Sequence, residues 1–294
     1  MQTIRQLKPL RKALAALCAE GGKLALVPTM GALHAGHMAL VAEARKRAKH
    51  VVVSIFVNPR QFGANEDLGA YPRRAAKDSA MLSEAGAALL WMPDAEVMYP
   101  AGYATSISVA GVSEGLDGAA RPGHFEGVAT VVAKLFNQVR PDVALFGEKD
   151  FQQLAVVRRM VADLDFGIEI VGVPTERDED GLALSSRNVY LTEEERQQAR
   201  ALPRALGMAA SAIEGGGDVG EALARAEAAL VEGGFQSVDY VTLCDAATLQ
   251  PLESLDRPAR LLAAARIGAA RLIDNVPVMP RDLSTDPVNH SSKP

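Results

Sequence analysis

The chain is organised around LALVPTMGALHAGHMAL, residues 24–40, which has the outline of a strand, a tight turn and the start of a helix. His34 and His37 flank Gly36 at the point where helical spacing resumes. A helix N-terminus carries unpaired backbone N–H groups and the positive end of the helix dipole, so it is a natural anion site. The two histidines add side-chain donors, and the glycine lets a phosphate approach the backbone. The stretch therefore predicts a nucleotide triphosphate site.

The composition limits the classes of function. The chain has 294 residues, 48% hydrophobic and 23% charged, which is long enough for one large globular domain and a smaller one. It has 31 Lys and Arg against 36 Asp and Glu, so no basic field favours a nucleic acid or an anionic membrane surface. We therefore expect small-molecule substrates, with no nucleic acid and no membrane as partners.

The cysteines and the N-terminus indicate the compartment. Cys18 and Cys244 are far apart and form no CxxC motif, which argues against a disulfide framework or a structural zinc site and suits a reducing compartment. Basic residues before the apolar ALAALCA imitate a signal peptide, but the apolar residues recur at helical spacing with charges between them. No apolar run approaches the roughly 18 residues of a membrane span. We expect an amphipathic first helix and a cytoplasmic protein.

Apolar runs alternate with helical patterns after the opening stretch. VVVSIFV, residues 51–57, is a continuous β-branched run of the kind buried on both faces in a parallel sheet. Further strands are predicted over residues 87–93, 105–109, 142–146 and 168–174, and helices over residues 72–85 and 127–139. The alternation predicts an α/β fold.

Polar residues follow two of these strands. Asn58 and Gln61 come directly after VVVSIFV, at the end where open α/β sheets bind ligands, although an ordinary polar loop explains them equally well. Lys149, in the GEKD that follows the strand at residues 142–146, is a point charge suited to phosphate. Asp150 either hydrogen-bonds a ribose or caps the next helix. His124, in RPGHFEG, is either catalytic or a solvated or capping residue.

A third polar stretch is ALSSRN, in which Ser185, Ser186 and Arg187 are consecutive. Two hydroxyls and a planar guanidinium suit a mobile phosphate clamp. The alternative is a serine-rich turn before a helix, because Thr192 and Glu195 form the T-x-x-E pattern of a capping box.

The C-terminal third is predicted to hold alanine-rich helices and an antiparallel sheet. The helices are expected over residues 192–214 and 219–232, and the strands over residues 238–245, 260–268 and 269–278. The stretch IGAARL is typical of a hairpin. A hinge is expected between residues 174 and 191.

Together these stretches resemble the pantoate–β-alanine ligases, also called pantothenate synthetases. The matching segments are PTMGALHAGH, SIFVNPRQFGANEDLGAYPR, RPGHFEGVATVVAKLFNQVRPDVALFGEKDFQQL, VGVPTERDEDGLALSSRN and ARIGAARLIDN. HAGH and LSSRN are similar to the two signatures of the nucleotidylyltransferase and class I aminoacyl-tRNA synthetase superfamily. The resemblance implies a Rossmann-like, doubly wound parallel sheet over residues 1–175 and a smaller α+β lid domain over residues 176–283. Residues 284–294 are expected to be a disordered tail.

The resemblance implies a two-step reaction. Pantoate carboxylate attacks the α-phosphorus of ATP, and β-alanine then attacks the acyl carbon of the pantoyl adenylate to give pantothenate and AMP. Neither step needs a protein nucleophile, so positioning and charge stabilisation should dominate. The alternative function is a nucleotidylyltransferase on the same superfold, which transfers AMP to a phosphate and stops there.

The resemblance also implies catalytic groups. His34 and His37 would contact the triphosphate, and His37 would donate a proton to the leaving phosphate. Lys149 and Arg187, with the two serines of ALSSRN, would neutralise charge as pyrophosphate departs. His34 and His37 are also spaced like metal ligands, but no third ligand falls at motif spacing.

The remaining contacts are implied in the same way. The ATP-binding residues would be Met30, Gly31, Ala32, Leu33, His34, Ala35, Gly36, His37, Asn58, Gly147, Glu148, Lys149, Asp150, Glu176, Leu184, Ser185, Ser186 and Arg187. Gln61 and Gln153 would hold pantoate, Gln61 would also bind β-alanine, and Gly147 and Asp150 would hold the ribose.

Magnesium and a second subunit are implied as well. Mg²⁺ would accompany ATP, bound mostly by phosphates and water, with Asp78 as its protein contact. A homodimer is the expected assembly. Glu176 departs from the family, which carries an apolar residue beside the adenine, and the change matters only if the side chain makes that contact.

Overall fold

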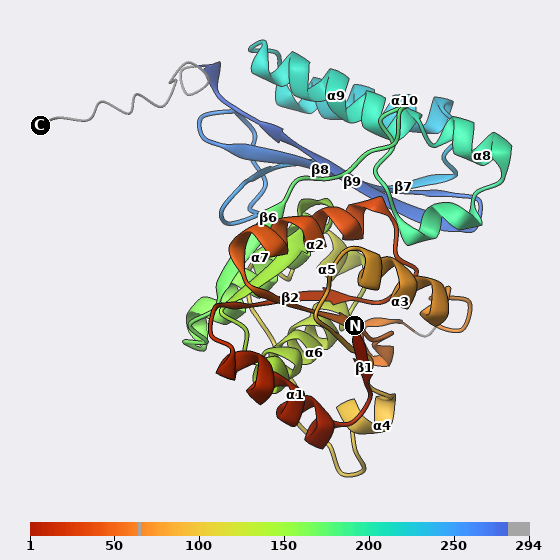
Figure 1. Ribbon diagram of the computed structural model, residues 1–294. Helices are drawn as coiled ribbons and strands as arrows, with labels where there is room; N and C mark the ends of the chain where they lie inside the picture. Colours follow the sequence, from red (N-terminus) through yellow and green to blue (C-terminus); the bar gives the residue numbers. More distant parts are fainter. Residues whose placement is uncertain (64–65, 282–294) are drawn as a thin grey trace, which may run out of the picture. The chain divides into compact units, whose positions relative to one another are not determined.

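The computed structural model describes residues 1–63 and 66–281, and the chain forms two compact units (Figure 1). The first unit comprises Met1–Asp178 and Ala183–Ser186. The second unit comprises Glu179–Leu182 and the described chain from Arg187 onward. The assignment of an ATP- and pantoate-binding domain to residues 1–175 and of a lid to residues 176–283 stays a prediction. The tail expected at residues 284–294 lies outside the described residues.

The first unit is built on a six-stranded sheet with the order β1-β4-β3-β2-β5-β6. Each pair of neighbouring strands runs parallel. The strands are β1 (Gln2–Ile4), β2 (Leu24–Thr29), β3 (His50–Ile55), β4 (Leu89–Trp91), β5 (Val143–Gly147) and β6 (Glu169–Val173). The helices are α1 (Leu7–Ala19), α2 (Ala35–Arg47), α3 (Ala75–Glu84), α4 (Ala95–Met98), α5 (Asp117–Ala120), α6 (His124–Val139) and α7 (Phe151–Asp163). Short 3₁₀ helices are η1 (Pro59–Gln61), η2 (Glu148–Asp150) and η3 (Ser186–Tyr190).

The sheet is wound in both directions from β2. The chain first places β3 and β4 on one side of β2, and then returns to place β5 and β6 on the other side. The strand order therefore reverses between β2 and β5. In open α/β sheets, ligands bind outside the carboxyl ends of the strands at this switch point. The turns that leave β2 and β5 are the segments that contain HAGH and GEKD.

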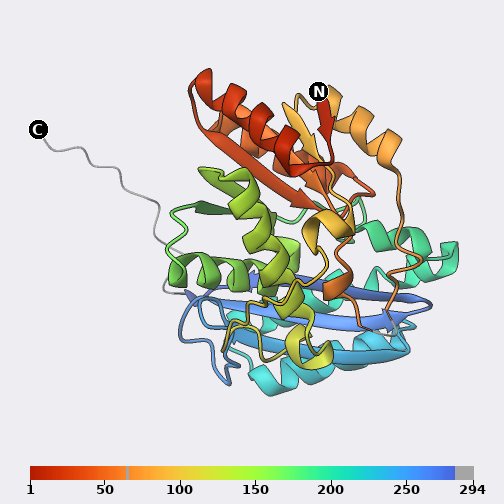
Figure 2. The ribbon, with the colours of Figure 1, turned by 90° about the horizontal axis from the view of Figure 1, so that it is seen from below.

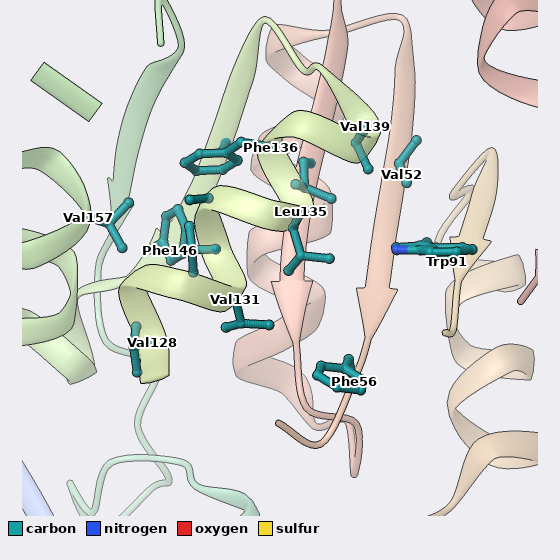
Figure 3. Packing of buried hydrophobic residues seen from close by; sticks show 14 of the residues in the cluster. Val52, Phe56, Trp91, Val128, Val131, Leu135, Phe136, Val139, Phe146 and Val157 are labelled. Atoms are coloured by element: carbon teal, nitrogen blue, oxygen red, sulfur yellow. The ribbon is translucent and has the colours of Figure 1, made fainter. Parts of the chain in front are cut away.

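The apolar strands are buried because helices cover both faces of the sheet. Leu24 and Leu26 of β2 pack in one cluster with α1, α6 and α7. Ala25 and Val27, which point the other way, pack in a second cluster with α2 and α3. Figure 3 shows α6 in the first cluster, where the rings of Phe136 and Phe146 meet edge to face with their centroids 6.4 Å apart. These layers confirm the predicted doubly wound α/β fold.

The strand predicted over residues 105–109 is wrong. In the described chain these residues pair with no strand. The backbone N–H of Ile107 instead donates to the Thr130 hydroxyl of α6 (2.9 Å), and the Ile107 and Val109 side chains pack against the α6 cluster. The alternation of apolar residues here reflects packing against a helix, which leaves the same sequence pattern as a sheet.

The second unit combines an antiparallel sheet with helices, which Figure 2 draws in blue and in cyan. Its strands are β7 (Ser237–Asp245), β8 (Ala259–Ile267) and β9 (Ala270–Val278), in the order β7-β8-β9. Its helices are α8 (Glu193–Gln198), α9 (Ala201–Glu214) and α10 (Val219–Glu232). The single helix predicted over residues 192–214 is thus two helices, and the Thr192 and Glu195 capping box starts the first of them. No helix in the described ranges has both the length and the apolar character to cross a membrane.

Candidate active site

The turn after β2 is shaped by a buried carboxylate. Gly31 and Ala32 both have left-handed backbone conformations, with φ of 87° and 51°. The backbone N–H groups of Ala32 and Leu33 donate to the two carboxylate oxygens of Asp78 (2.9 and 3.0 Å). Asp78 lies in the first turn of α3 and is 1% exposed. A side chain at Gly31 would start 3.2 Å from the same carboxylate, so a glycine suits this position.

These contacts change the interpretation of Asp78. The resemblance implied a magnesium contact, but both oxygens accept backbone hydrogen bonds and the side chain is buried. The structure therefore gives Asp78 the role of an anchor for the turn that leads into HAGH.

We expect Asp78→Asn to weaken this turn. The amide NH₂ would face a backbone N–H, so one hydrogen bond to a charged group is lost, a change of about 1.5–3 kcal/mol in the free energy of unfolding. The melting temperature should fall and the KM for ATP should rise. Asp94→Asn, which alters a carboxylate that is 65% exposed, is the control and should change neither quantity. Unchanged melting and KM in the Asp78 variant would refute the anchor role.

His34 and His37 form a capping box at the start of α2. His34 Nδ1 accepts the backbone N–H of Gly36 (3.2 Å), and His37 Nδ1 accepts the backbone N–H of His34 (3.3 Å). A ring nitrogen that accepts a hydrogen bond carries no proton, so each neutral ring has its proton on Nε2. A Cβ at Gly36 would lie 3.0 Å from the His34 ring, so glycine leaves room for this cap. The pair therefore offers two Nε2–H donors at a helix N-terminus.

The charge of Lys149 reaches both histidines. Burial, followed by the electrostatic effects of His34 and Lys149, lowers the pKa of His37 to about 3. Burial and then Lys149 also lower the pKa of His34, while Asp150 acts in the opposite direction. Both imidazoles are therefore neutral at neutral pH. Lys149 and Asp150 lie in η2 after β5, so the predicted HAGH and GEKD stretches do come together at the switch point.

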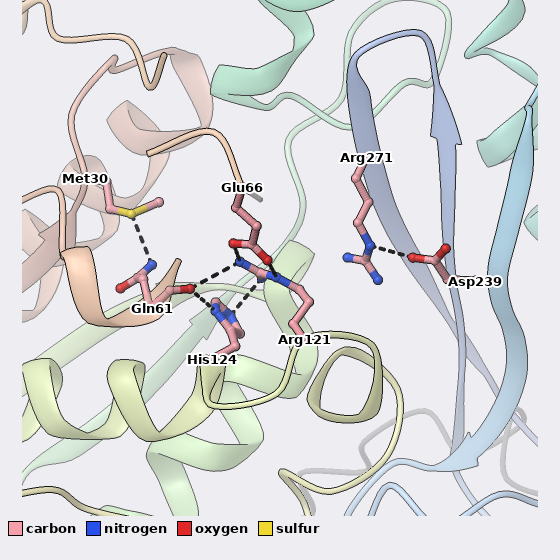
Figure 4. Close-up of polar contacts among 7 residues, drawn as sticks. All are labelled: Met30, Gln61, Glu66, Arg121, His124, Asp239 and Arg271. Carbon is pink, nitrogen blue, oxygen red and sulfur yellow. Dashed lines mark hydrogen bonds and ion pairs between the residues drawn. The ribbon is translucent and has the colours of Figure 1, made fainter. Parts of the chain in front are cut away.

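Gln61 and Asn58 lie together after β3. Gln61 is in η1 and donates its side-chain NH₂ to the Met30 sulfur (3.1 Å), which places it beside the turn after β2 (Figure 4). Asn58 caps η1 and is 1% exposed, so its amide is not presented to a ligand. The ATP contact that the resemblance implied for Asn58 therefore has no support in this geometry.

Gly127 lets η1 pack directly on α6. A Cβ at this position would lie 2.7 Å from the backbone nitrogen of Gln61 and still closer to the carbonyl oxygen of Arg60. Real Cβ atoms do not approach backbone this closely, so any larger residue must push η1 away. No sequence signal indicated this role, because a glycine inside a helical pattern usually indicates only a less stable helix.

A charged network holds the backbone of Gln61 (Figure 4). The Arg121 guanidinium donates to both carboxylate oxygens of Glu66, each at 2.7 Å, and to His124 Nε2 (3.0 Å). His124 Nδ1 in turn donates to the carbonyl oxygen of Gln61 (2.8 Å). His124 is 9% exposed, and burial, followed by the nearby Arg121 charge, lowers its pKa to about 4. His124 is thus a neutral structural donor, and the sequence pattern missed this network.

The titration of His124 predicts acid sensitivity. Its native pKa is about 4, below the ordinary 6.5, so below pH 6.5 the unfolded chain binds a proton that the native chain does not. The contribution of neutral His124 to the free energy of unfolding is therefore complete above pH 6.5 and decreases as the pH drops toward 4. We expect the melting temperature to fall over this range, and His124→Asn, which retains a donor for the Gln61 carbonyl, to show a smaller fall. An equal pH dependence in both proteins would contradict the assignment.

Glu176 lies beside the histidine pair. Its Cβ is 3.7 Å from the position that a Gly36 Cβ would take. Its carbonyl oxygen accepts the backbone N–H of Leu184 (2.9 Å), which closes a turn and brings the start of ALSSRN back to the first unit. The Ser186 hydroxyl lies 3.0 Å from the hydroxyl of Tyr71, which is buried.

Two residues predicted to contact ligands, Gln153 and Arg187, lie in different units. Gln153 is half-buried in the first turn of α7, and its side chain makes no hydrogen bond within residues 1–63 and 66–281. Its neighbour Gln152 is buried and bonds to the backbone of Val112, Gly115 and Asp117. Arg187 belongs to the second unit. Arg187 and Gln153 therefore stay predictions as ligand contacts.

Comparison with known proteins identifies the family. Residues 2–277 match the family model described as pantoate-beta-alanine ligase. The pantothenate synthetase of Rhizorhabdus wittichii is 68% identical over 280 residues, which cover 95% of this chain and 99% of that protein. The pantothenate synthetase of Sphingopyxis alaskensis is 63% identical over 278 residues, which cover 95% and 100%.

Solved structures agree with the sequence match. The pantothenate synthetase of Thermus thermophilus has a TM-score of 0.90 and 51% identity, covering 95% of this chain and 100% of that chain. The pantoate-beta-alanine ligase of Francisella tularensis, complexed with beta-gamma ATP and beta-alanine, has a TM-score of 0.80 and 32% identity, covering 94% and 97%. The resemblance found in the motifs is thereby confirmed. With its motifs, its fold and its full-length relatives in agreement, this chain belongs to the pantoate–β-alanine ligase family.

Proposed function

We propose that this enzyme condenses pantoate with β-alanine at the expense of ATP, through pantoyl adenylate, and that the first unit supplies most of the substrate contacts. The observation that carries this proposal is the meeting of two neutral histidine donors with Lys149 at the switch point of the sheet. The family contains ligases, which favours this reaction over the nucleotidylyltransferase alternative.

In the first step, a pantoate carboxylate oxygen forms a bond to the α-phosphorus, and the bond from this phosphorus to the oxygen of pyrophosphate breaks. Negative charge accumulates on the departing pyrophosphate. The Nε2–H groups of His34 and His37 are suited to donate hydrogen bonds to it, and the Lys149 ammonium is suited to stabilise its charge. Because His37 is neutral in the free protein, we propose that its Nε2–H donates a hydrogen bond to phosphate.

In the second step, the β-alanine amine attacks the acyl carbon, the bond from this carbon to AMP breaks, and the amine loses a proton. Positioning dominates this step because the adenylate is already activated. Gln61 lies beside Met30, where the acid and the amine would meet. The ligands of the Francisella tularensis relative, beta-gamma ATP and beta-alanine, support these substrate classes.

The remaining contacts are proposed from the family resemblance. Gln153 would hold pantoate, and Gly147 and Asp150 would hold the ribose. Residues of the ALSSRN stretch, Ser185, Ser186 and Arg187, would bind phosphate. Glu176 would border the adenine, since its side chain starts beside the N-terminus of α2.

Magnesium is proposed to arrive with ATP, held by phosphate oxygens and water, which is the coordination this ion prefers. Asp78 does not fit a metal ligand because its oxygens are bonded to backbone, and the described residues hold no group of three His, Cys, Asp or Glu suited to an ion. We further propose a cytoplasmic homodimer. Light scattering after size exclusion would test the dimer, with twice the 31.1 kDa of one chain as the expected mass.

The decisive experiment is ATP–pyrophosphate exchange with and without pantoate. The two-step reaction predicts exchange that requires pantoate and does not require β-alanine. Adding β-alanine should then release AMP in equal amounts with pantothenate. Exchange that is independent of pantoate would refute the proposed function.

A further inference from the structure

The side chain of Asn58 has used all of its hydrogen-bonding capacity within the protein. Its Nδ2 donates to Gln61 Oε1 (3.0 Å) and to the carbonyl oxygen of Gly127 (3.1 Å). Its Oδ1 accepts from the Tyr99 hydroxyl (2.8 Å) and from the backbone N–H of Arg60 (3.3 Å). A primary amide has two N–H donors and two acceptor positions, so none is left for a ligand.

The backbone fixes which way this amide lies. The Gly127 carbonyl can only accept a hydrogen bond, and the Arg60 N–H can only donate one. Turning the Asn58 amide over would place two acceptors face to face on one side and two donors on the other. Since Asn58 is buried, water cannot compensate for either mismatch. The side chain therefore has one permitted orientation.

The orientation of the Asn58 amide determines the orientation of the Gln61 amide. Because Asn58 presents an N–H, Gln61 must present its oxygen to Asn58, which turns the Gln61 NH₂ toward Met30. The backbone of Gln61 is independently held by the His124 donor and by the close packing of η1 on Gly127. Both the place of Gln61 and the direction of its NH₂ are thus set by buried groups of the protein.

We propose that Asn58 is a positioning residue that orients the Gln61 amide so that its NH₂, and not its carbonyl, faces the acid substrate. A carboxylate accepts hydrogen bonds and donates none, so a carbonyl in this place would repel pantoate where an NH₂ binds it. This inference rests on the proposed function in one respect, which is the assignment of pantoate to Gln61.

The test is a double-mutant cycle with the KM values for pantoate and ATP as readouts. Gln61→Ala and Asn58→Ala should each raise the KM for pantoate by about tenfold and leave the KM for ATP within about twofold. In the double variant, Asn58→Ala should add little, because its effect acts through Gln61. Tyr99→Phe is the matched control, since it removes one hydrogen bond to Asn58 but retains both backbone constraints. It should leave the KM for pantoate within about twofold.

The outcomes separate this inference from the proposed function. If Gln61→Ala leaves the KM for pantoate unchanged, the assignment of pantoate to Gln61 fails. If Gln61→Ala raises it, but Asn58→Ala raises the KM for ATP or its effect adds fully to that of Gln61→Ala, the positioning role is overturned.

A second variant covers the case in which Asn58→Ala does not fold. Gln61→Glu retains an oxygen that accepts from Asn58 but replaces the NH₂ by a second oxygen. The inference predicts weaker pantoate binding in Gln61→Glu than in Gln61→Ala, because an oriented oxygen opposes the carboxylate. Equal or tighter binding would overturn it.

Discussion

Replacing Lys149 with alanine is expected to lower the rate of pantoate adenylation by about 10²-fold or more, the scale of losing one charge-stabilising group in an active site. The Lys149 charge acts on both His34 and His37, which places it at the same helix N-terminus as their donors. Negative charge grows on pyrophosphate as it leaves, so the ammonium stabilises the transition state more than bound ATP. The rate of ATP–pyrophosphate exchange at saturating pantoate measures the effect.

Two control variants sharpen this prediction. Lys8→Ala removes an exposed ammonium from α1 and should leave the exchange rate unchanged. Lys149→Arg retains the charge but alters its shape and reach, so its rate should lie between wild type and Lys149→Ala. Exchange within about threefold of wild type in Lys149→Ala would show that this charge is not part of adenylation.

Replacing His37 with alanine is expected to lower the exchange rate by about 10²-fold as well, for two reasons that can be separated. The variant loses an Nε2–H donor, and it also loses the ring nitrogen that accepts the backbone N–H of His34. The second loss loosens the start of α2 and should lower the melting temperature. Exchange and thermal unfolding, measured on the same preparation, report the two effects.

His37→Gln separates the donor from the cap. A glutamine at the third helical position can reach back to the N-cap backbone, as in an ordinary capping box. Its melting temperature should therefore lie near wild type while the exchange rate stays low. Recovery of the rate together with the stability would show that the cap alone explains the role of His37.

The pH dependence of exchange tests the protonation state of His37. With a pKa of about 3, the ring is already neutral at pH 6 and stays neutral to pH 8. The rate should therefore not fall with a midpoint near 6.5 as the pH rises through this range. A fall with that midpoint in wild type, absent in His37→Gln, would instead identify the imidazolium as a proton donor.

Local sequence patterns predicted most of the strands and helices, and they predict an anion site at the HAGH turn. Apolar runs predicted β2, β3 and β5 because buried parallel strands need apolar residues on both faces. The spacing of Thr192 and Glu195 predicted a capping box because its contacts span three residues. The glycine and two histidines of HAGH predicted an anion site because a helix N-terminus is formed locally.

These local patterns did not predict which distant segments of the chain pack against one another. Periodicity tells which side of a strand is buried but not which strand or helix covers it. For this reason the segment at residues 105–109 was mistaken for a strand, and the order that places β5 beside β2 appeared only in the folded sheet.

The roles of the buried polar residues were decided in the same way. Asp78 carries a carboxylate, which can bind a metal, and Asn58 carries an amide, which can bind phosphate. The residue type does not tell whether either side chain faces solvent or the protein interior. Asp78 accepts a hydrogen bond from Leu33, which lies 45 residues away in the chain, and Asn58 donates one to Gly127, which lies 69 residues away. The sequence by its local patterns specified strands, helix starts and the chemistry of the HAGH turn. The tertiary structure alone selected the anchors of that turn and the orientation of Gln61, because a hydrogen bond depends on which distant groups folding brings within about 3 Å.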